Sequence, residues 1–477
     1  MSLSKFLQTI LIITAGVIFI FFVSWHWKLG LIRYFDVDEF AHLHWTSHML
    51  MGNRPYIDFL SFFPPGFWIF LSPVFVKGWG TVQPILSARI LMFFIFLGNA
   101  AAAGVLFYIL RKNSFAIFPA LLFAFLPLPM DKIIEIRPDN LATLLLLAGL
   151  ILQVQRRALW SGVCYGLSLL VLTKIAPTVI FAFLVLFFLE RRRVPSFLLG
   201  LALPLSVFGV WAISTGHFST IWYSLVNLPL EANKLANIFF MGPDLFFYPN
   251  NIYYGQGGVN TGLIVNHALW LFGIGIGAYR LLQFSREELL PAGIFILNVA
   301  LYVLYIPLKH AQYLIPIALF VALYGADGLL LIWKKLSRHP LGAVSGFALF
   351  LMGLIGLYQT FLLVNKPKLS WTNVEMLSNL EKVWQTVPKN EYILDLDGST
   401  LYYPDPYYAC CLPFGQWQGF LSQPLPSLSK ALETTKTKYI FQGSLKRVTT
   451  LQPTDQAYIT DHYTISSMGG ELLWMSP

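Results

Sequence analysis

Residues 84–110 read PILSARILMFFIFLGNAAAAGVLFYIL, and the next two residues are Arg111 and Lys112. As a helix, an apolar run of this length is sufficient to cross a hydrocarbon core of about 30 Å. The basic pair that follows marks a cytoplasmic end. Because similar apolar runs recur along the chain, this stretch predicts an all-α polytopic membrane protein.

The composition agrees with this fold class, since 56% of the 477 residues are hydrophobic and only 12% are charged. Soluble domains are typically about 25% charged, so a soluble enzyme, a disordered chain and a coiled coil are excluded. The net charge of +9 reflects Lys and Arg at cytoplasmic loop ends and does not indicate nucleic acid. Only three cysteines are present, which excludes a disulfide framework and Cys-x-x-Cys metal sites.

Apolar segments long enough to span predict about eleven transmembrane helices. These segments are 6–27, 84–110, 114–130, 139–155, 158–173, 175–189, 195–213, 262–283, 289–306, 312–333 and 341–364. Basic clusters between them, placed on the cytoplasmic side, leave the loops 28–83, 130–138 and 214–261 outside, together with the turn at Lys174. If the apolar segment 62–79 also crossed, this sidedness would fail, so we expect an interfacial or re-entrant helix there.

Three carboxylates gather in the first outer loop, as Asp36-Val-Asp38-Glu39. We expect residues 40–52 to form an amphipathic helix on the membrane surface, whose dipole favours anions at its N-terminus. A solvated acidic loop is the alternative. The functional interpretation is favoured because the helix would hold the carboxylates at the level of the lipid headgroups.

Ionisable residues also occur at the outer ends of later spans. Asp139 follows Arg137-Pro138 at a predicted helix start, where a simple N-cap is the alternative. Lys174 lies between two apolar half-spans, a costly position that marks functional residues, although snorkelling to the interface is equally compatible. Lys309 and His310 lie at the outer end of a later span and could bind a phosphate. Tyr313 and Pro316, which follow them, could simply be an interface anchor and a kink.

In this order the residues resemble C-type (GT-C) integral-membrane glycosyltransferases, in the branch of the protein O-mannosyltransferases and the lipid A aminoarabinose transferase. The resemblance covers residues 6–364. The matching motifs are Asp38-Glu39, Gly52-Asn-Arg54-Pro-Tyr56-Ile-Asp58, Pro64-Pro65, Ala88-Arg89, Arg137-Pro-Asp139, Leu172-Thr-Lys174 and Tyr313-Leu-Ile-Pro316. Many relatives carry Lys or His before the paired prolines. Phe63 stands there in this chain, so that phosphate contact is absent or comes from another residue such as Lys309.

The resemblance implies inverting transfer of a hexosyl or pentosyl group from a polyprenyl-phosphate-linked donor to a lipid, glycan or protein acceptor at the outer face. We assign Asp38 as the base, expecting burial beside lipid to raise its pKa. Glu39 would hold the acceptor or the local geometry, and Asp139 would orient the sugar or the acceptor. Candidate ligands of the donor phosphate are Arg137, Lys174, Lys309 and His310. Candidate substrate-binding residues are Asp36, Arg54, Tyr56, Asp58 and Tyr313.

No cofactor is required by the sequence, and no ligand spacing demands a metal. A divalent cation is nevertheless compatible with the convergent carboxylates. Short loops and the lack of a retention signal favour a bacterial inner membrane with a periplasmic site.

The composition changes after the last span, and residues 365–477 predict a small extracytoplasmic α/β domain beside the glycosyltransferase-like region 1–364. We expect a helix at 371–387 and strands near 392–396, 438–442 and 471–475. Because a disulfide between neighbours is strained, Cys410 and Cys411 are predicted to be small packing residues.

Two other classes of function compete with glycosyl transfer. A transporter or flippase of a lipid-linked saccharide would use the same kind of cavity, but transporters more often show repeated halves, and no internal repeat is visible. A structural or assembly membrane protein gives no reason for an intramembrane Lys or for paired acidic loops.

Overall fold

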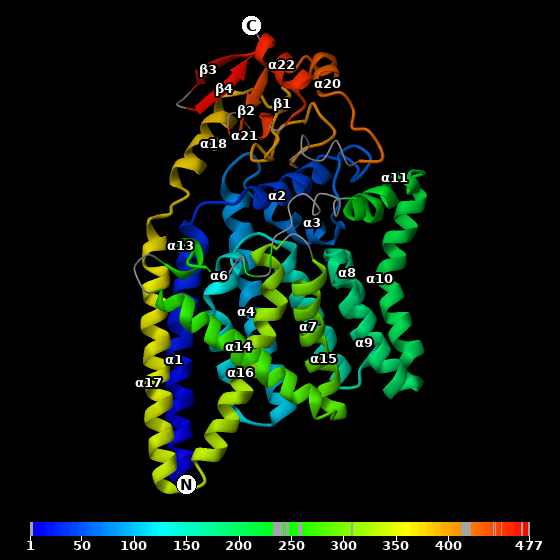
Figure 1. Cartoon of the computed structure of the whole chain (residues 1–477). Coiled ribbons are helices and arrows are strands. Elements are labelled where there is room, and N and C mark those ends of the chain that lie inside the picture. The colour runs from blue at the N-terminus through cyan, green and yellow to red at the C-terminus, as the bar shows by residue number, and fades with distance from the viewer. Residues whose placement is uncertain are drawn as a thin grey trace.

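The structure, a computed structural model, describes residues 3–231, 242, 244, 248–255, 260–306, 309–411, 421–441, 443, 445–449, 451–468 and 471–475. Part of the predicted outer loop 214–261 therefore lies outside the described residues. The described helices form an elongated bundle, and a small sheet sits at the end opposite the N-terminus (Figure 1).

Seven described helices are long and apolar enough to cross a membrane. Their α-helical parts are α1 (Leu3–Ile32), α4 (Gln83–Arg111), α10 (Val194–Ser214), α14 (Thr261–Leu282), α15 (Arg286–Ala300), α16 (Ile315–Leu336) and α17 (Pro340–Asn365). α1 packs along α17 at one edge of the bundle, and α16 is the most buried of the seven. The chain is thus an integral multi-pass membrane protein, as its composition predicts.

The remaining apolar helices are short or bent. They are α5 (Ile117–Phe125), α6 (Pro127–Ile133), α7 (Pro138–Val154), α8 (Ala158–Val171) and α9 (Ala176–Leu189). α5, with the short η2 (Ser114–Ala116), is bent by 79° against α6 and can count with it as an eighth span. α8 and α9 have 14 residues each, which is roughly 21 Å of helix. Each predicted span coincides with a helix except 114–130, which the bend divides between α5 and α6. The total of about eleven crossings stays a prediction.

Short turns connect these helices. The break between α8 and α9 falls at η3 (Thr173–Ile175), where the sequence predicts it, and η4 (Arg191–Arg193) precedes α10. η7 (Leu301–Tyr305) and η8 (Ala311–Leu314) lie on either side of the connection between α15 and α16. The elements described between α10 and α14 are α11 (Phe218–Trp222), η5 (Tyr223–Asn227) and α13 (Asn251–Tyr254).

The first outer loop contains α2 (Val37–Leu50), which is capped by Asp36 and Glu39 in a capping box. The prediction of an amphipathic surface helix over 40–52 is wrong, because every residue from Glu39 to His48 is buried. The membrane helices pack beneath α2, and the C-terminal tail covers it from above, where Ser47 Oγ donates to the Leu401 carbonyl at 2.5 Å.

The apolar segment 62–79 contains only α3 (Gly66–Leu71) and η1 (Ser72–Phe75). Together they measure about 15 Å as helix, which is too short to cross. This length agrees with the expected interfacial or re-entrant helix.

The tail folds around a four-stranded sheet with the strand order β1-β2-β4-β3. Its elements are η9 (Pro367–Ser370), α18 (Val374–Thr386), β1 (Ile393–Leu394), α20 (Leu428–Thr435), β2 (Tyr439–Phe441), α21 (Leu445–Val448), α22 (Pro453–His462), β3 (Thr464–Met468) and β4 (Glu471–Met475). β1 is parallel to β2, and β4 runs antiparallel to both β2 and β3. The helix and the three predicted strands are found, and β3 is an additional strand.

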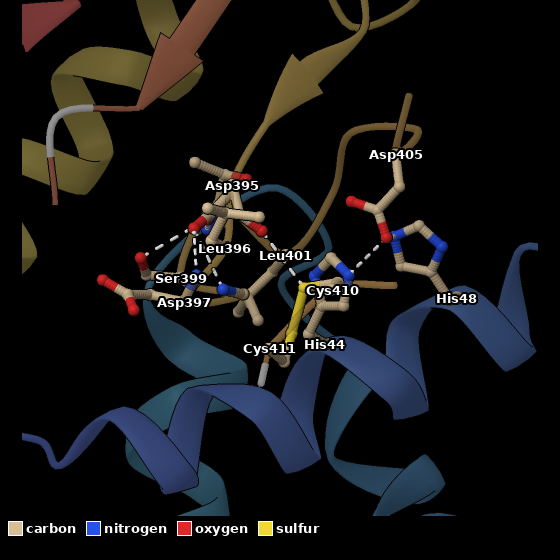
Figure 2. Close-up of a disulfide and its surroundings, with 12 residues drawn as sticks. His44, His48, Asp395, Leu396, Asp397, Ser399, Leu401, Asp405, Cys410 and Cys411 are labelled. Atoms are coloured by element: carbon tan, nitrogen blue, oxygen red, sulfur yellow. Dashed lines mark hydrogen bonds and ion pairs between the residues drawn. A yellow bond between two sulfur atoms is a disulfide. The ribbon is translucent and has the colours of Figure 1, made fainter. Parts of the chain in front are cut away.

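Cys410 and Cys411 form a disulfide within the tail. The prediction that they are only packing residues is therefore wrong. Cys411 has a φ of 71°, so the backbone turns sharply at the pair. The disulfide lies against Gly398 and beside the side chain of His44 (Figure 2).

Candidate active site

Five charged residues from three elements meet where α2 begins, and we call them the outer cluster. Its members are Asp36, Asp38, Lys132, Glu135 and Arg137. Arg137 stands at the N-cap of α7 and donates to Glu135 Oε2 at 2.6 Å and to Asp38 Oδ2 at 2.7 Å. It also lies 3.2 Å from Asp36 Oδ1. Lys132 of α6 joins Asp36 and Glu135 at 3.0 and 2.9 Å. The two acidic loops predicted to share one face are thus in direct contact.

Accessibility separates these carboxylates. The Asp38 side chain is 52% exposed, whereas the Glu135 side chain is 1% exposed and that of Glu39 is completely buried. The buried Arg137 guanidinium holds the Asp38 carboxylate in a fixed position. The exposed part of the Asp38 side chain remains accessible to a ligand.

The electrostatics of Asp38 differ from expectation. Loss of water around the carboxylate acts most strongly and raises the pKa of Asp38, but the charge of Arg137, the hydrogen bond that Arg137 donates and the nearby His42 together act in the opposite direction and exceed it. The net effect holds the pKa of Asp38 below its usual value, so the expected upward shift is wrong. Asp38 is consequently ionised at neutral pH.

Glu39 points away from Asp38 into the protein. Arg89 of α4 forms a bidentate ion pair with it, in which Arg89 Nη2 lies 2.5 Å from Glu39 Oε1. Glu39 also accepts the backbone N–H of Ile136 at 2.9 Å. Both side chains of the pair are completely buried. Of the two roles considered for Glu39, this geometry favours holding the local structure.

A second group of predicted residues faces the outer cluster from α7, η3 and the turn before α16. Lys174 forms an ion pair with Asp139 and lies 3.5 Å from the centroid of the Tyr313 ring. The rings of His310 and Tyr313 are 5.4 Å apart. Burial lowers the pKa of His310, and the charges of Asp38 and Lys174 act on it in opposite directions. These interactions place the group within electrostatic reach of Asp38.

Four other predicted residues have different surroundings. Lys309 donates to the carbonyl of Ile306, and its ammonium lies 5.3 Å from the centroid of the Tyr302 ring. The other three residues are Arg54, Tyr56 and Asp58. They follow the far end of α2, about 20 Å along the helix axis from Asp38.

Those three residues make contacts of their own. Arg54 and Asp58 are paired at 3.0 Å. Tyr56 is fully buried and donates to the Phe63 carbonyl at 2.8 Å. The structure therefore does not bring them to the outer cluster.

Several charged residues near the site carry no predicted role. Arg33 Nη1 lies 3.5 Å from both Asp131 and Glu135, and Lys368 donates to Asp131 at 2.9 Å. Lys132, described above, links α6 to the start of α2. Each is an ionisable residue at the end of an apolar segment, which is the signal that could have identified them. Their partners could not be inferred, because Lys368 and Asp131 are 237 positions apart.

The outer cluster does not fit a divalent cation. Asp36, Asp38 and Glu135 each face the positive nitrogens of Lys132 or Arg137, and these fixed cations take the space that a metal would need. Two other groups of described residues bring metal-ligating atoms together: His44 with His48 and Asp405, and His44 with the two disulfide cysteines.

No protein-family profile matches the sequence, and no curated protein matches it significantly. Solved structures do match. ArnT from Cupriavidus metallidurans, bound to undecaprenyl phosphate, is 12% identical with a TM-score of 0.60, over 100% of this chain and 98% of ArnT. The oligosaccharyltransferase of Archaeoglobus fulgidus, tethered to an acceptor peptide, is 13% identical with a TM-score of 0.55, over 97% of this chain and 74% of that protein. Both are GT-C glycosyltransferases. The chain therefore has the fold of the GT-C integral-membrane glycosyltransferases, as its motifs predict.

Proposed function

We propose that the protein transfers a hexosyl or pentosyl group, with inversion, from a polyprenyl-phosphate donor to an acceptor at the outer face of the membrane. The observation that carries this proposal is an accessible, ionised Asp38 within electrostatic reach of an accessible Lys174 at the ends of apolar helices. An anionic lipid headgroup brought to this level would meet a cation and a proton acceptor together. The fold shared with ArnT and the oligosaccharyltransferase supports the same class of reaction.

Lys174 is the favoured phosphate ligand among the predicted cations. Its side chain is 32% exposed, whereas that of Arg137 is 4% exposed and is held by three carboxylates. The Tyr313 ring beneath Lys174 stabilises the ammonium through its π face. Lys174 also remains paired with Asp139, so a phosphate would compete with that carboxylate. His310 can add a hydrogen bond from the same side.

The transfer follows from these positions. The acceptor hydroxyl or amine attacks the anomeric carbon from the face opposite the phosphate. The bond between that carbon and the phosphate oxygen breaks, and both electrons leave with the oxygen. Lys174 offsets the charge that develops there. The acceptor proton passes to the Asp38 carboxylate as the new bond forms, because the attacking group becomes strongly acidic only then.

Other charged residues act by positioning. Arg137 fixes the Asp38 carboxylate, and Glu39 fixes the backbone on which Asp38 stands. Asp36 caps α2 and joins it to Lys132. Asp139, released from Lys174 by the incoming phosphate, is placed to orient a sugar hydroxyl.

Replacing the base tests this assignment. Asp38→Asn keeps the size of the side chain and removes the proton acceptor, so sugar transfer from a radiolabelled polyprenyl-phosphate donor should fall by about 10²–10⁴-fold. Asp58→Asn is the matched control, because Asp58 is paired with Arg54 beyond the far end of α2. Transfer by Asp38→Asn at the level of Asp58→Asn would rule out Asp38 as the base.

We further propose that the tail, 365–477, forms a separate domain on the same outer face as Asp38, periplasmic in a bacterial inner membrane. The contact between Ser47 of α2 and Leu401 of the tail supports a shared side. In a Cys164→Ser background, Thr434→Cys should react with an impermeant maleimide on intact spheroplasts. Arg157→Cys, in a predicted cytoplasmic turn, should react only after lysis. The reverse labelling pattern would invert the orientation.

A further inference from the structure

A cluster of potential metal ligands joins α2 to the tail, away from Asp38. His44 and His48 lie one turn apart on one face of α2, and Asp405 of the tail faces both (Figure 2). His44 Nε2 is 2.7 Å and His48 Nε2 is 3.6 Å from Asp405 Oδ2, and the two rings are 4.2 Å apart. Both histidines are buried. Two segments separated by more than half the chain thus place three ligands of two types, imidazole and carboxylate, around one point.

The donor atoms are those that a zinc site uses. One nitrogen from each imidazole and one carboxylate oxygen lie within 4.8 Å of one another. Zn²⁺ takes such nitrogen and oxygen ligands, and two histidines four residues apart on a helix present theirs to a single ion. Three protein ligands would leave one position for water.

The hydrogen-bonding capacity of His48 Nε2 is not used by the described residues. This atom is buried and lacks a hydrogen-bond partner among the described residues, a condition that normally costs stability. A metal ion would use its lone pair. His48 Nδ1 lies 3.0 Å from the side-chain amide of Asn53. The amide oxygen and nitrogen are interchangeable in assignment, so Asn53 Oδ1 can accept from Nδ1–H and orient the ring, as neighbouring groups do for metal-bound histidines.

The charge around Asp405 also differs from that of the outer cluster. Among the described residues, no Lys or Arg forms an ion pair with Asp405, and its partners are His44 and His48. The described partners of this carboxylate are therefore imidazoles, which can lose a proton and bind a metal, in contrast to Asp36 and Asp38, which face the permanent charges of Lys132 and Arg137.

We propose that His44, His48 and Asp405 bind a divalent transition-metal ion, with Zn²⁺ the best match, which fastens the C-terminal tail onto α2. The alternative set, His44 with Cys410 and Cys411, requires thiolates, and these cysteines are joined in a disulfide. The proposal is independent of glycosyl transfer, because none of its ligands belongs to the outer cluster.

Metal content of the purified full-length protein tests the site. After treatment with EDTA and reloading with Zn²⁺, mass spectrometry of the metal should find about one ion per chain. His48→Ala and Asp405→Asn should each abolish that binding. His462→Ala, an exposed histidine on α22, should keep it. Wild-type protein that retains no Zn²⁺ after reloading, or equal retention in His48→Ala, would overturn the proposal.

A second measurement remains informative if these variants fold poorly. X-ray absorption of the zinc-loaded wild type should show only nitrogen and oxygen ligands near 2.0–2.1 Å. A sulfur shell near 2.3 Å would instead assign the ion to Cys410 or Cys411 and overturn the proposed ligand set. Zn²⁺ should also raise the melting temperature of the wild type. The same melting temperature in EDTA and in Zn²⁺ would contradict a structural role for the metal.

Discussion

Replacing Glu39 with Gln should destabilise the fold by about 3–5 kcal/mol, because it leaves the charge of Arg89 buried without a counter-ion. Both side chains are completely buried, and Arg89 Nη2 lies 2.5 Å from Glu39 Oε1. Two unit charges with centres about 4 Å apart attract by about 4 kcal/mol at an effective dielectric constant of about 20, which agrees with that range. Gln keeps the shape of the side chain and one acceptor oxygen, so the loss of stability reflects mainly the loss of the negative charge.

A double-mutant cycle isolates the pair. Unfolding of Glu39→Gln, Arg89→Gln and the double variant would be followed by Trp fluorescence in mixed detergent micelles with increasing SDS. The double variant should lose less free energy of unfolding than the two single variants lose in sum, with a coupling energy of about 2–3 kcal/mol. Lys438→Gln, which breaks an exposed pair with Glu391, should cost at most about 1 kcal/mol. Additive losses at Glu39 and Arg89 would refute the view that this pair anchors α2.

Three further predictions concern the site and the tail. Arg137→Gln removes the charge that depresses the pKa of Asp38. That pKa should rise, and kcat/KM should begin to fall at a higher pH on the acidic side; an unshifted profile would contradict the assignment. Lys174→Gln should weaken competitive inhibition by polyprenyl phosphate at least about tenfold, and unchanged inhibition would exclude Lys174 as a phosphate ligand. Gly398 has a φ of 76°, and an added Cβ would lie 2.6 Å from a disulfide sulfur, so Gly398→Ala should destabilise by about 1–3 kcal/mol. Gly16→Ala, with open space around it, should not lower the melting temperature.

Local patterns were sufficient to predict the membrane helices. Apolar length alone identifies segments such as 84–110, and the break at Lys174 follows from one costly charge in an apolar run. The capping carboxylates at the start of α2 could also be read locally, since Asp36 and Glu39 have the spacing of a capping box.

Long-range contacts account for what the sequence did not reveal. The burial of α2 depends on a tail more than three hundred positions away, as the pair Ser47 and Leu401 shows. The low pKa of Asp38 depends on Arg137, whose side chain reaches it only because α7 begins beside α2. A pattern of hydropathy contains no information on such pairings. It therefore predicts an amphipathic helix on the membrane surface, and burial beside lipid, considered without Arg137, predicts a raised pKa.

The tail was predicted less completely than the bundle. Its strands are short, and β3 reads Thr-Ile-Ser-Ser-Met, which lacks the alternation of apolar and polar residues that marks a half-buried strand. Likewise, no local feature predicts that Asp405 would meet His44 and His48, since the three come together only when the tail folds over α2.

Sugar transfer by the purified protein tests the central claim most directly. Reconstituted in vesicles with a radiolabelled polyprenyl-phosphate sugar and a mixed lipid acceptor, the wild type should form a labelled product and release free polyprenyl phosphate. Asp58→Asn should do the same, and Asp38→Asn should not. If the donor instead moved between the two leaflets intact, with no product formed and no dependence on Asp38, the protein would be a transporter of lipid-linked saccharides and the account of its outer cluster as a transferase site would be wrong.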